Sequence, residues 1–180
     1  MSLITATSLS KSFGAEDIFR GLSFSVPKGA RLAVVGPNGC GKTTLLRILV
    51  GEDEASSGTV TRSRSARIGY LPQEADFQME GTLWDACQSV FAELIQKQDE
   101  LHRLESLMES TNADDEVMAR YGKLQHDFER RGGYTYVTRI KQVLTGLGFD
   151  ASDYGLSLAH LSGGQRTRAF LARLLLSDPD

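Results

Sequence analysis

Apolar and polar positions alternate along the first part of the chain as they do in β-strands. The segment 4–13 is predicted to be a strand that runs into a turn at Gly14, and 18–26 alternates as a second strand. After a turn at 27–29, the segment 31–35 is a nearly continuous apolar run, which predicts a strand buried on both faces of a sheet. Shorter strands are expected at 59–61 and 67–71.

Helical spacing first appears between these strands and dominates after residue 82. A helix is predicted over 42–50, with Gly51 as its C-terminal glycine. Two apolar faces between 83 and 131 predict an antiparallel helical hairpin with its tip near 110–113. The first face is Leu94, Leu101, Leu104 and Met108, and the second is Val117, Tyr121, Leu124 and Phe128.

The hairpin and the helices after it have recognisable end signals. Asn112, with Asp115 three positions later, is a start signal for the second helix of the hairpin, and Gly132-Gly133 ends that helix. A further helix is predicted over 136–147, closed by Gly148. The last is predicted over 165–176, and its apolar side is Phe170, Leu171, Leu174 and Leu175.

Composition and charge narrow the class of protein. Apolar residues make up 41% and charged residues 24% of the 180, as in ordinary globular proteins. No apolar run reaches the length of about eighteen residues that crosses a bilayer, and the N-terminus lacks the features of a secretory signal. Cys40 and Cys87 do not suggest a disulfide framework, so a cytoplasmic location is expected. The net charge of −3 gives no bulk attraction for nucleic acid or an anionic membrane, although a local basic patch is not excluded.

The glycine-rich stretch before the first helix fits a phosphate-binding loop. It consists of Gly36, Pro37, Asn38, Gly39, Cys40, Gly41, Lys42 and Thr43, with Thr44 next in the helix. Glycines let backbone N–H groups turn toward an anion, and the helix N-terminus adds partial positive charge. Lys42 can supply its charge to the β- and γ-phosphates of a nucleotide, and the Thr43 hydroxyl can bind Mg²⁺. A chance glycine-rich turn is the alternative, and the strand–loop–helix context argues against it.

A second candidate anion site precedes the last helix, at 161–165. Ser162, Gly163, Gly164 and Gln165 lead into that helix, whose first N–H groups and dipole favour an anion. By itself this segment is also compatible with a serine-capped helix start after a flexible turn. By itself Gln73, after Pro72, is a solvated loop residue, and Phe13 is a core residue.

The order of the phosphate loop, Gln73 and 161–165 resembles that of the nucleotide-binding domain of ABC-type ATPases, over essentially the whole chain. The resemblance implies an α/β fold, in which a P-loop NTPase core is joined to an antiparallel β subdomain and to a helical subdomain with a hairpin insertion. The corresponding parts are 1–82 (β subdomain and phosphate-loop core), 83–131 (hairpin arm) and 132–180 (helical subdomain with the signature segment 161–165).

The same resemblance implies the ligands and the role of each candidate residue. ATP and Mg²⁺ bind at the phosphate loop, Phe13 stacks on adenine, and Lys42 and Gln73 serve catalysis. Gln73 contacts Mg²⁺ or the attacking water and senses the partner. Ser162 and Gly164, with Gly163 and Gln165 beside them, cap the γ-phosphate of ATP bound to a second nucleotide-binding domain, in the same chain or in a dimer mate.

The hairpin suggests a subfamily. Gln73 and Leu161 are 88 positions apart, more than in transporter ATPases, and the hairpin fills the difference. The hairpin, the segments 131–134 and 146–149, and the run 161–176 resemble the first domain of ABC-F proteins, which are soluble duplicated ATPases, several of them acting on ribosomes. The ribosome or its RNA is then the expected partner.

Two other functions stay open from the sequence. The chain fits the ATPase subunit of a membrane transporter, docked to a permease, and it fits a nucleotide-binding module that does not hydrolyse. Ten acidic and six basic residues between Glu93 and Arg131 suit a solvated hairpin at least as well as a nucleic-acid-binding surface.

The family pattern continues beyond Asp180 into an apolar strand with a Mg²⁺-binding aspartate (Walker B) and a water-activating glutamate, and then to a histidine. Within these 180 residues nothing matches them, and His102, His126 and His160 do not fit the histidine's place. Since phosphoryl transfer depends on such groups, we expect this chain by itself to be essentially inactive as an ATPase. We also expect low stability, because that strand would lie beside 31–35 and cover its edge.

Overall fold

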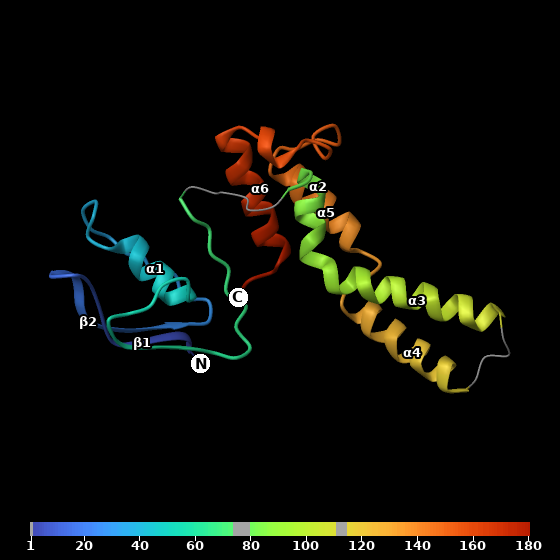
Figure 1. Ribbon diagram of the computed structural model, residues 1–180, viewed down its shortest axis with the longest axis horizontal. Coiled ribbons are helices and arrows are strands. Elements are labelled where there is room, and N and C mark those ends of the chain that lie inside the picture. The colour runs from blue at the N-terminus through green and yellow to red at the C-terminus, as the bar shows by residue number, and fades with distance from the viewer. Residues whose placement is uncertain (1, 74–79, 111–114) are drawn as a thin grey trace. The chain divides into compact units, whose positions relative to one another are not determined.

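The computed structural model describes residues 2–73, 80–110 and 115–180, which form two compact units (Figure 1). The first unit comprises 1–70 together with 178–180, and the second comprises 71–177. Each unit is described by itself. In the described part of the chain, no helix combines the length and the apolar character needed to span a bilayer.

The first unit is a three-stranded antiparallel sheet covered on one face by a helix. Strands β1 (Ser2–Phe13), β2 (Glu16–Pro27) and β3 (Ser57–Arg62) pair in the order β2-β1-β3. Helix α1 (Lys42–Val50) lies along this sheet (Figure 1). A small apolar core joins them, made of Ala6, Leu9, Leu45, Ile48 and Leu49.

A bulge in β1 decides which of its side chains face α1. Ser8 has a left-handed backbone with φ of 50°. Around this residue, β1 shifts register in its pairing with β2 and in its pairing with β3. Because the bulge resets the alternation, burial passes from Ala6 before it to Leu9 and Lys11 after it. Gly58 of β3 lies against the bulge, where a Cβ would come within 2.4 Å of the Ser8 carbonyl oxygen. Only glycine fits there.

The second unit is helical. Its elements are α2 (Leu83–Gln88), η1 (Ser89–Phe91), α3 (Ala92–Ser110), α4 (Asp115–Arg130), α5 (Tyr136–Gly146), η2 (Leu158–His160) and α6 (Gly163–Leu176). Helices α3 and α4 lie side by side as an antiparallel hairpin (Figure 1). Sixteen buried residues form one core across the described part of this unit, and its largest fully buried side chains include Leu83, Phe128, Ile140 and Leu144. At the end of the hairpin, a Cβ on Gly133 would lie 2.4 Å from the Phe128 ring, so glycine permits the chain to turn there.

Most of the elements expected from the sequence are present. The strands predicted at 4–13, 18–26 and 59–61 correspond to β1, β2 and β3, and helix 42–50 has the predicted bounds, followed by Gly51 with φ of 93°. The hairpin and the helices 136–147 and 165–176 are also confirmed, to within two residues at their ends. The start signal at Asn112 and the predicted tip lie largely outside the described residues.

Two predicted strands are wrong. The segment 31–35 is not a strand, and it is exposed rather than buried, with Val35 at 90%. Within the described residues no segment pairs with it, and a strand exists only through hydrogen bonds to a neighbour. The segment 67–71 is also irregular. The Arg67 N–H donates to a carboxylate oxygen of Asp180 (3.0 Å), and the Asp180 N–H donates to the Arg67 carbonyl oxygen (2.9 Å). A single pair of residues is too few to form a strand ladder.

The apolar side assigned to the last helix is also wrong. Helix α6 buries Ala169, Ala172 and Leu176, whereas Leu175 is exposed and Phe170, Leu171 and Leu174 are only half-buried. Small alanine side chains let the helix approach α2 and α5 closely, so the contact face is set by the alanines rather than by the largest apolar residues.

Candidate nucleotide-binding site

Glycines shape the loop that leads into α1. Gly39 and Gly41 have left-handed backbones, with φ of 84° and 90°. A Cβ on Gly41 would lie 2.2 Å from Ile18 Cγ2, because β2 presses against the loop at this point. A Cβ on Gly36 would lie 2.7 Å from Cys40 Sγ, where the two ends of the loop approach each other. The spacing of the glycines therefore follows from close backbone approach as well as from backbone conformation.

Lys42 folds back over this loop. Its Nζ donates hydrogen bonds to the carbonyl oxygens of Gly36 (2.9 Å) and Pro37 (2.7 Å), and it lies 3.8 Å from Cys40 Sγ. The lysine is the first residue of α1, so its charge is added to the positive end of the helix dipole.

The N-terminus of α1 has no side chain that competes with an anion. Gly41 is the N-cap and makes no side-chain cap, and the first turn contains no acidic residue. Thr43 is exposed, Thr44 is half-buried, and both lie in this first turn. Backbone N–H groups, an ammonium group and a hydroxyl group are thus gathered at one place, which is the arrangement that a polyphosphate and its Mg²⁺ require.

Phe13 lies in the same unit, at the end of β1. Its side chain is 55% exposed, which is unusual for a phenylalanine and contradicts the plain interpretation as a core residue. The Lys11 ammonium lies over its ring, 4.8 Å from the centroid.

The signature residues and Gln73 belong to the second unit. Ser162 and Gln165 form a capping box: Ser162 Oγ accepts from Gln165 N (3.3 Å), and Gln165 Oε1 accepts from Ser162 N (2.9 Å). Gly163 and Gly164 are exposed in the first turn of α6, where backbone N–H groups have no intrahelical acceptor. Gln73 is exposed. The predicted residues therefore form two groups, one in each unit.

The structure assigns the two cysteines different environments. Cys40 is exposed in the phosphate loop, whereas Cys87 is fully buried in the helical core, and burial raises the pKa of its thiol to about 11. Among the described residues, no group of three or more His, Cys, Asp or Glu side chains is placed to hold a metal ion.

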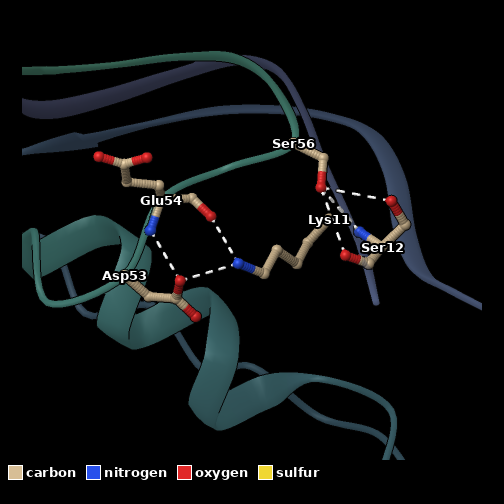
Figure 2. A network of polar contacts seen from close by, with 5 residues as sticks. All are labelled: Lys11, Ser12, Asp53, Glu54 and Ser56. Carbon is tan, nitrogen blue, oxygen red and sulfur yellow. Dashed lines mark hydrogen bonds and ion pairs between the residues drawn. The ribbon is translucent and has the colours of Figure 1, made fainter. Parts of the chain in front are cut away.

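Sequence reasoning missed the polar residues behind the site. Lys11 is only 8% exposed, and its Nζ donates to Asp53 Oδ1 (2.8 Å) and to the Glu54 carbonyl oxygen (2.7 Å), as Figure 2 shows. The lysine two positions before Phe13 is visible in the sequence, but nothing near it in the chain marks it as buried. The bulge at Ser8, after which Leu9 and Lys11 face the core, was not predictable.

Comparison with known proteins places the chain in a family. The family model described as ABC transporter matches residues 19–180, which include the phosphate loop, Gln73 and the signature segment. The chain belongs to the ABC transporter ATPase family. The ABC ATPase fold, a mixed α/β fold with an antiparallel β subdomain and a helical region, is thereby confirmed.

Curated relatives cover almost the whole of this ABC domain. It is 35% identical to the putative ATP-binding protein YdiF of Bacillus subtilis over 100% of the chain, and 31% identical to the tylosin resistance ATP-binding protein TlrC of Streptomyces fradiae over 99%. It is 33% identical over 91% to the energy-dependent translational throttle protein EttA of Escherichia coli. These relatives are ABC-F proteins, the subfamily that the sequence resembles. The ABC domain spans only 28%, 33% and 29% of their respective lengths.

Solved structures of ABC proteins share the fold. The ATP-binding subunit of an ABC transporter superposes with a TM-score of 0.66 at 20% identity, over 99% of this chain and 63% of that one. An inward-facing metal-chelate type ABC transporter gives a TM-score of 0.59 at 25% identity, over 99% and 58%.

Proposed function

We propose that the chain binds Mg-ATP at the phosphate loop. The observation that carries this proposal is the junction of the loop and α1, where Lys42 Nζ lies 2.9 and 2.7 Å from two loop carbonyl oxygens at an uncapped helix N-terminus. When nucleotide binds, the ammonium can exchange these carbonyls for phosphate oxygens. The β- and γ-phosphates then lie against the loop N–H groups, and Thr43 binds the metal.

Equilibrium binding of a fluorescent ATP analogue to the purified chain tests this proposal. Lys42→Ala is expected to weaken binding by at least about tenfold, the scale of one lost charge-assisted interaction with phosphate. Lys28→Ala is the matched control, because Lys28 is an exposed lysine of the same unit whose ion pair is with Asp180. Equal binding by the wild type and Lys42→Ala would mean that ATP does not bind at the phosphate loop.

The signature segment serves a second nucleotide in this proposal. Gly163 and Gly164 offer N–H groups at the start of α6, and the capping box holds Ser162 and Gln165 in place, so the segment can meet the γ-phosphate of ATP held by another ABC domain. ATP is then enclosed between two domains, in one chain or in a dimer. Gln73 is proposed to contact Mg²⁺ or the attacking water once the domains close.

For the larger role, we propose an ABC-F ATPase acting on the ribosome in the cytoplasm. Two features support it: the helical hairpin α3–α4, and relatives named for translational throttling and for tylosin resistance. The parts proposed are 1–82 for the β subdomain and phosphate loop, 83–131 for the arm, and 132–180 for the helical subdomain. Co-sedimentation of the ATP-bound protein with ribosomes tests this role, and its absence at physiological salt would contradict it.

A transporter ATPase is the second candidate. It is supported by the likeness to a metal-chelate type ABC transporter at 25% identity over 99% of the chain. The two candidates differ in partner, since the transporter ATPase would co-purify with a membrane protein rather than with ribosomes. In either role, we propose that the 180 residues by themselves bind ATP but turn it over very slowly, since none of them matches the water-activating glutamate.

A further inference from the structure

One buried lysine in the first unit has a role that the phosphate loop does not explain. Lys11 is the one charged residue in the described part of the chain that is buried among the core residues. Removing an ammonium group from water is costly unless it is paired, and here Asp53 Oδ1 and the Glu54 carbonyl oxygen accept hydrogen bonds from it at 2.8 and 2.7 Å (Figure 2). The ammonium is therefore held in one place.

The partners of Lys11 are themselves fixed. Asp53 Oδ1 also accepts from Glu54 N (2.7 Å), and the hydrogen bond from Lys11 is the main cause that lowers the pKa of the Asp53 carboxyl. Next along the segment, Ser56 Oγ accepts from Ser12 N (3.0 Å) (Figure 2). The segment after α1 is thus joined to β1 at the two residues that come immediately before Phe13.

The ammonium is placed against the ring of Phe13. Its Nζ lies 4.8 Å from the ring centroid, within the distance at which a cation is attracted to an aromatic face. Phe13 is the last residue of β1, two positions after Lys11. A cation under one face fixes the ring and withdraws electron density from it, and both effects favour stacking of an electron-rich purine on the other face. Phe13 is 55% exposed, so its ring has room for such a partner.

We propose that Lys11, held by Asp53 and Glu54, is a positioning residue that orients and polarises the Phe13 ring for stacking on the adenine base. The inference rests on the proposed function, because it assumes that ATP binds at this unit, and it takes Phe13 as the residue that stacks on the base, as the sequence resemblance implies. It adds that base recognition depends on a partly buried ion pair between β1 and the segment after α1. Lys11 itself touches neither base nor phosphate.

Binding of Mg-ATP and of magnesium tripolyphosphate, which lacks base and ribose, separates the role of Lys11 from general stability. The variants are Lys11→Met, Phe13→Leu and the double variant, with Lys28→Met as the control on an exposed lysine of the same unit. Lys11→Met is expected to weaken ATP binding by about three- to tenfold and to change tripolyphosphate binding by less than about twofold. In the Phe13→Leu background, the same change is expected to cause no further selective loss.

Several outcomes would overturn the inference. Equal weakening of ATP and tripolyphosphate by Lys11→Met would mean that Lys11 only stabilises the fold. A selective loss that persists in full without the Phe13 ring would mean that Lys11 acts elsewhere. If Lys11→Met does not fold, Lys11→Met with Asp53→Asn removes the ion pair without leaving a charge alone, and the same selective loss is expected of it. Phe13→Leu that leaves ATP binding unchanged, while Lys42→Ala weakens it, would overturn this inference and leave the proposed function standing. The proposed function fails by a different result, namely ATP binding that Lys42→Ala does not weaken.

Discussion

The two units of this ABC domain are built on cores of very different size. Sixteen buried residues form the described core of the helical unit, whereas five form that of the unit that carries the phosphate loop. The binding loop and the segment before it are exposed almost throughout. The helical unit is therefore held together mainly by burial of apolar surface, and the first unit has to rely on other interactions as well.

Polar contacts at both ends of α1 add to the stability that the small apolar core gives the first unit. At the C-terminal end, Arg62 of β3 donates to the carbonyl oxygens of Leu49 (2.7 Å) and Ile48 (2.8 Å), which are among the last residues of the helix. At the N-terminal end, Lys42 bonds to the loop. We therefore expect the stability of the nucleotide-binding unit, rather than that of the helical unit, to respond to ligand, because its loop gains partners when phosphate binds.

The largest expected effect is a core truncation in the helical unit. Phe128 is 1% exposed and its ring meets Tyr134 edge-on, with centroids 5.1 Å apart. Phe128→Ala should lower the free energy of unfolding of this unit by about 3–5 kcal/mol, as cavity-forming changes of a buried phenylalanine do. Urea denaturation followed by helical circular dichroism measures it. Met118→Ala on the same helix, at a site 53% exposed, should cost less than about 0.5 kcal/mol, and similar costs at both sites would contradict the assignment of the core.

The next largest effect is stabilisation by Mg-ATP, which should differ between the two units. Mg-ATP at about one hundred times its dissociation constant should stabilise the first unit by about 2.7 kcal/mol and leave the helical unit nearly unchanged. Amide hydrogen exchange resolves this, with slower exchange expected in β1 and α1 and no change in α3 and α4. At the same nucleotide concentration, Lys42→Ala should reduce this stabilisation to about 1.4 kcal/mol or less, as a loss of affinity of at least about tenfold requires. Slowing of exchange by the same amount in both units would mean that the two units do not respond to ligand independently.

A smaller effect concerns the pH dependence of the hairpin. Lys97 and Arg130 both donate to the carboxylate of Asp127 and lower its pKa from 3.8 to about 2. A carboxyl whose folded pKa is depressed adds stability above its ordinary pKa and loses it as the pH falls toward the folded value. Asp127→Asn should therefore lower the urea midpoint near pH 6, and the difference from wild type should shrink between about pH 4 and about pH 2. A difference in urea midpoint that stays constant over that range would exclude the ion pairs of Asp127 as its cause. Asp99→Asn, at an exposed carboxylate, is the control.

The sequence predicted best where structure depends on near neighbours. Helix 42–50 and the hairpin follow from local spacing and end signals, and the phosphate loop follows from glycines whose positions match close contacts in the structure. The segments 31–35 and 67–71 were mispredicted because an apolar run indicates a tendency to be buried, whereas a strand also needs a partner distant in the chain. The inward face of α6 was missed because Ala169 and Ala172 make contact through their small size. The place of Lys11 depends on the bulge at Ser8, and no local pattern reveals it.

Alkylation of the two cysteines reports whether Mg-ATP occupies the phosphate loop of the first unit. Cys40 is exposed within the loop, and Cys87, buried with a pKa of about 11, serves as a control in the same molecule. Mg-ATP at a concentration above about ten times its dissociation constant should slow labelling of Cys40 by at least about tenfold. Cys87 should label slowly with and without nucleotide. Labelling of Cys40 at the same rate in saturating Mg-ATP as in its absence would mean that nucleotide does not bind at this loop.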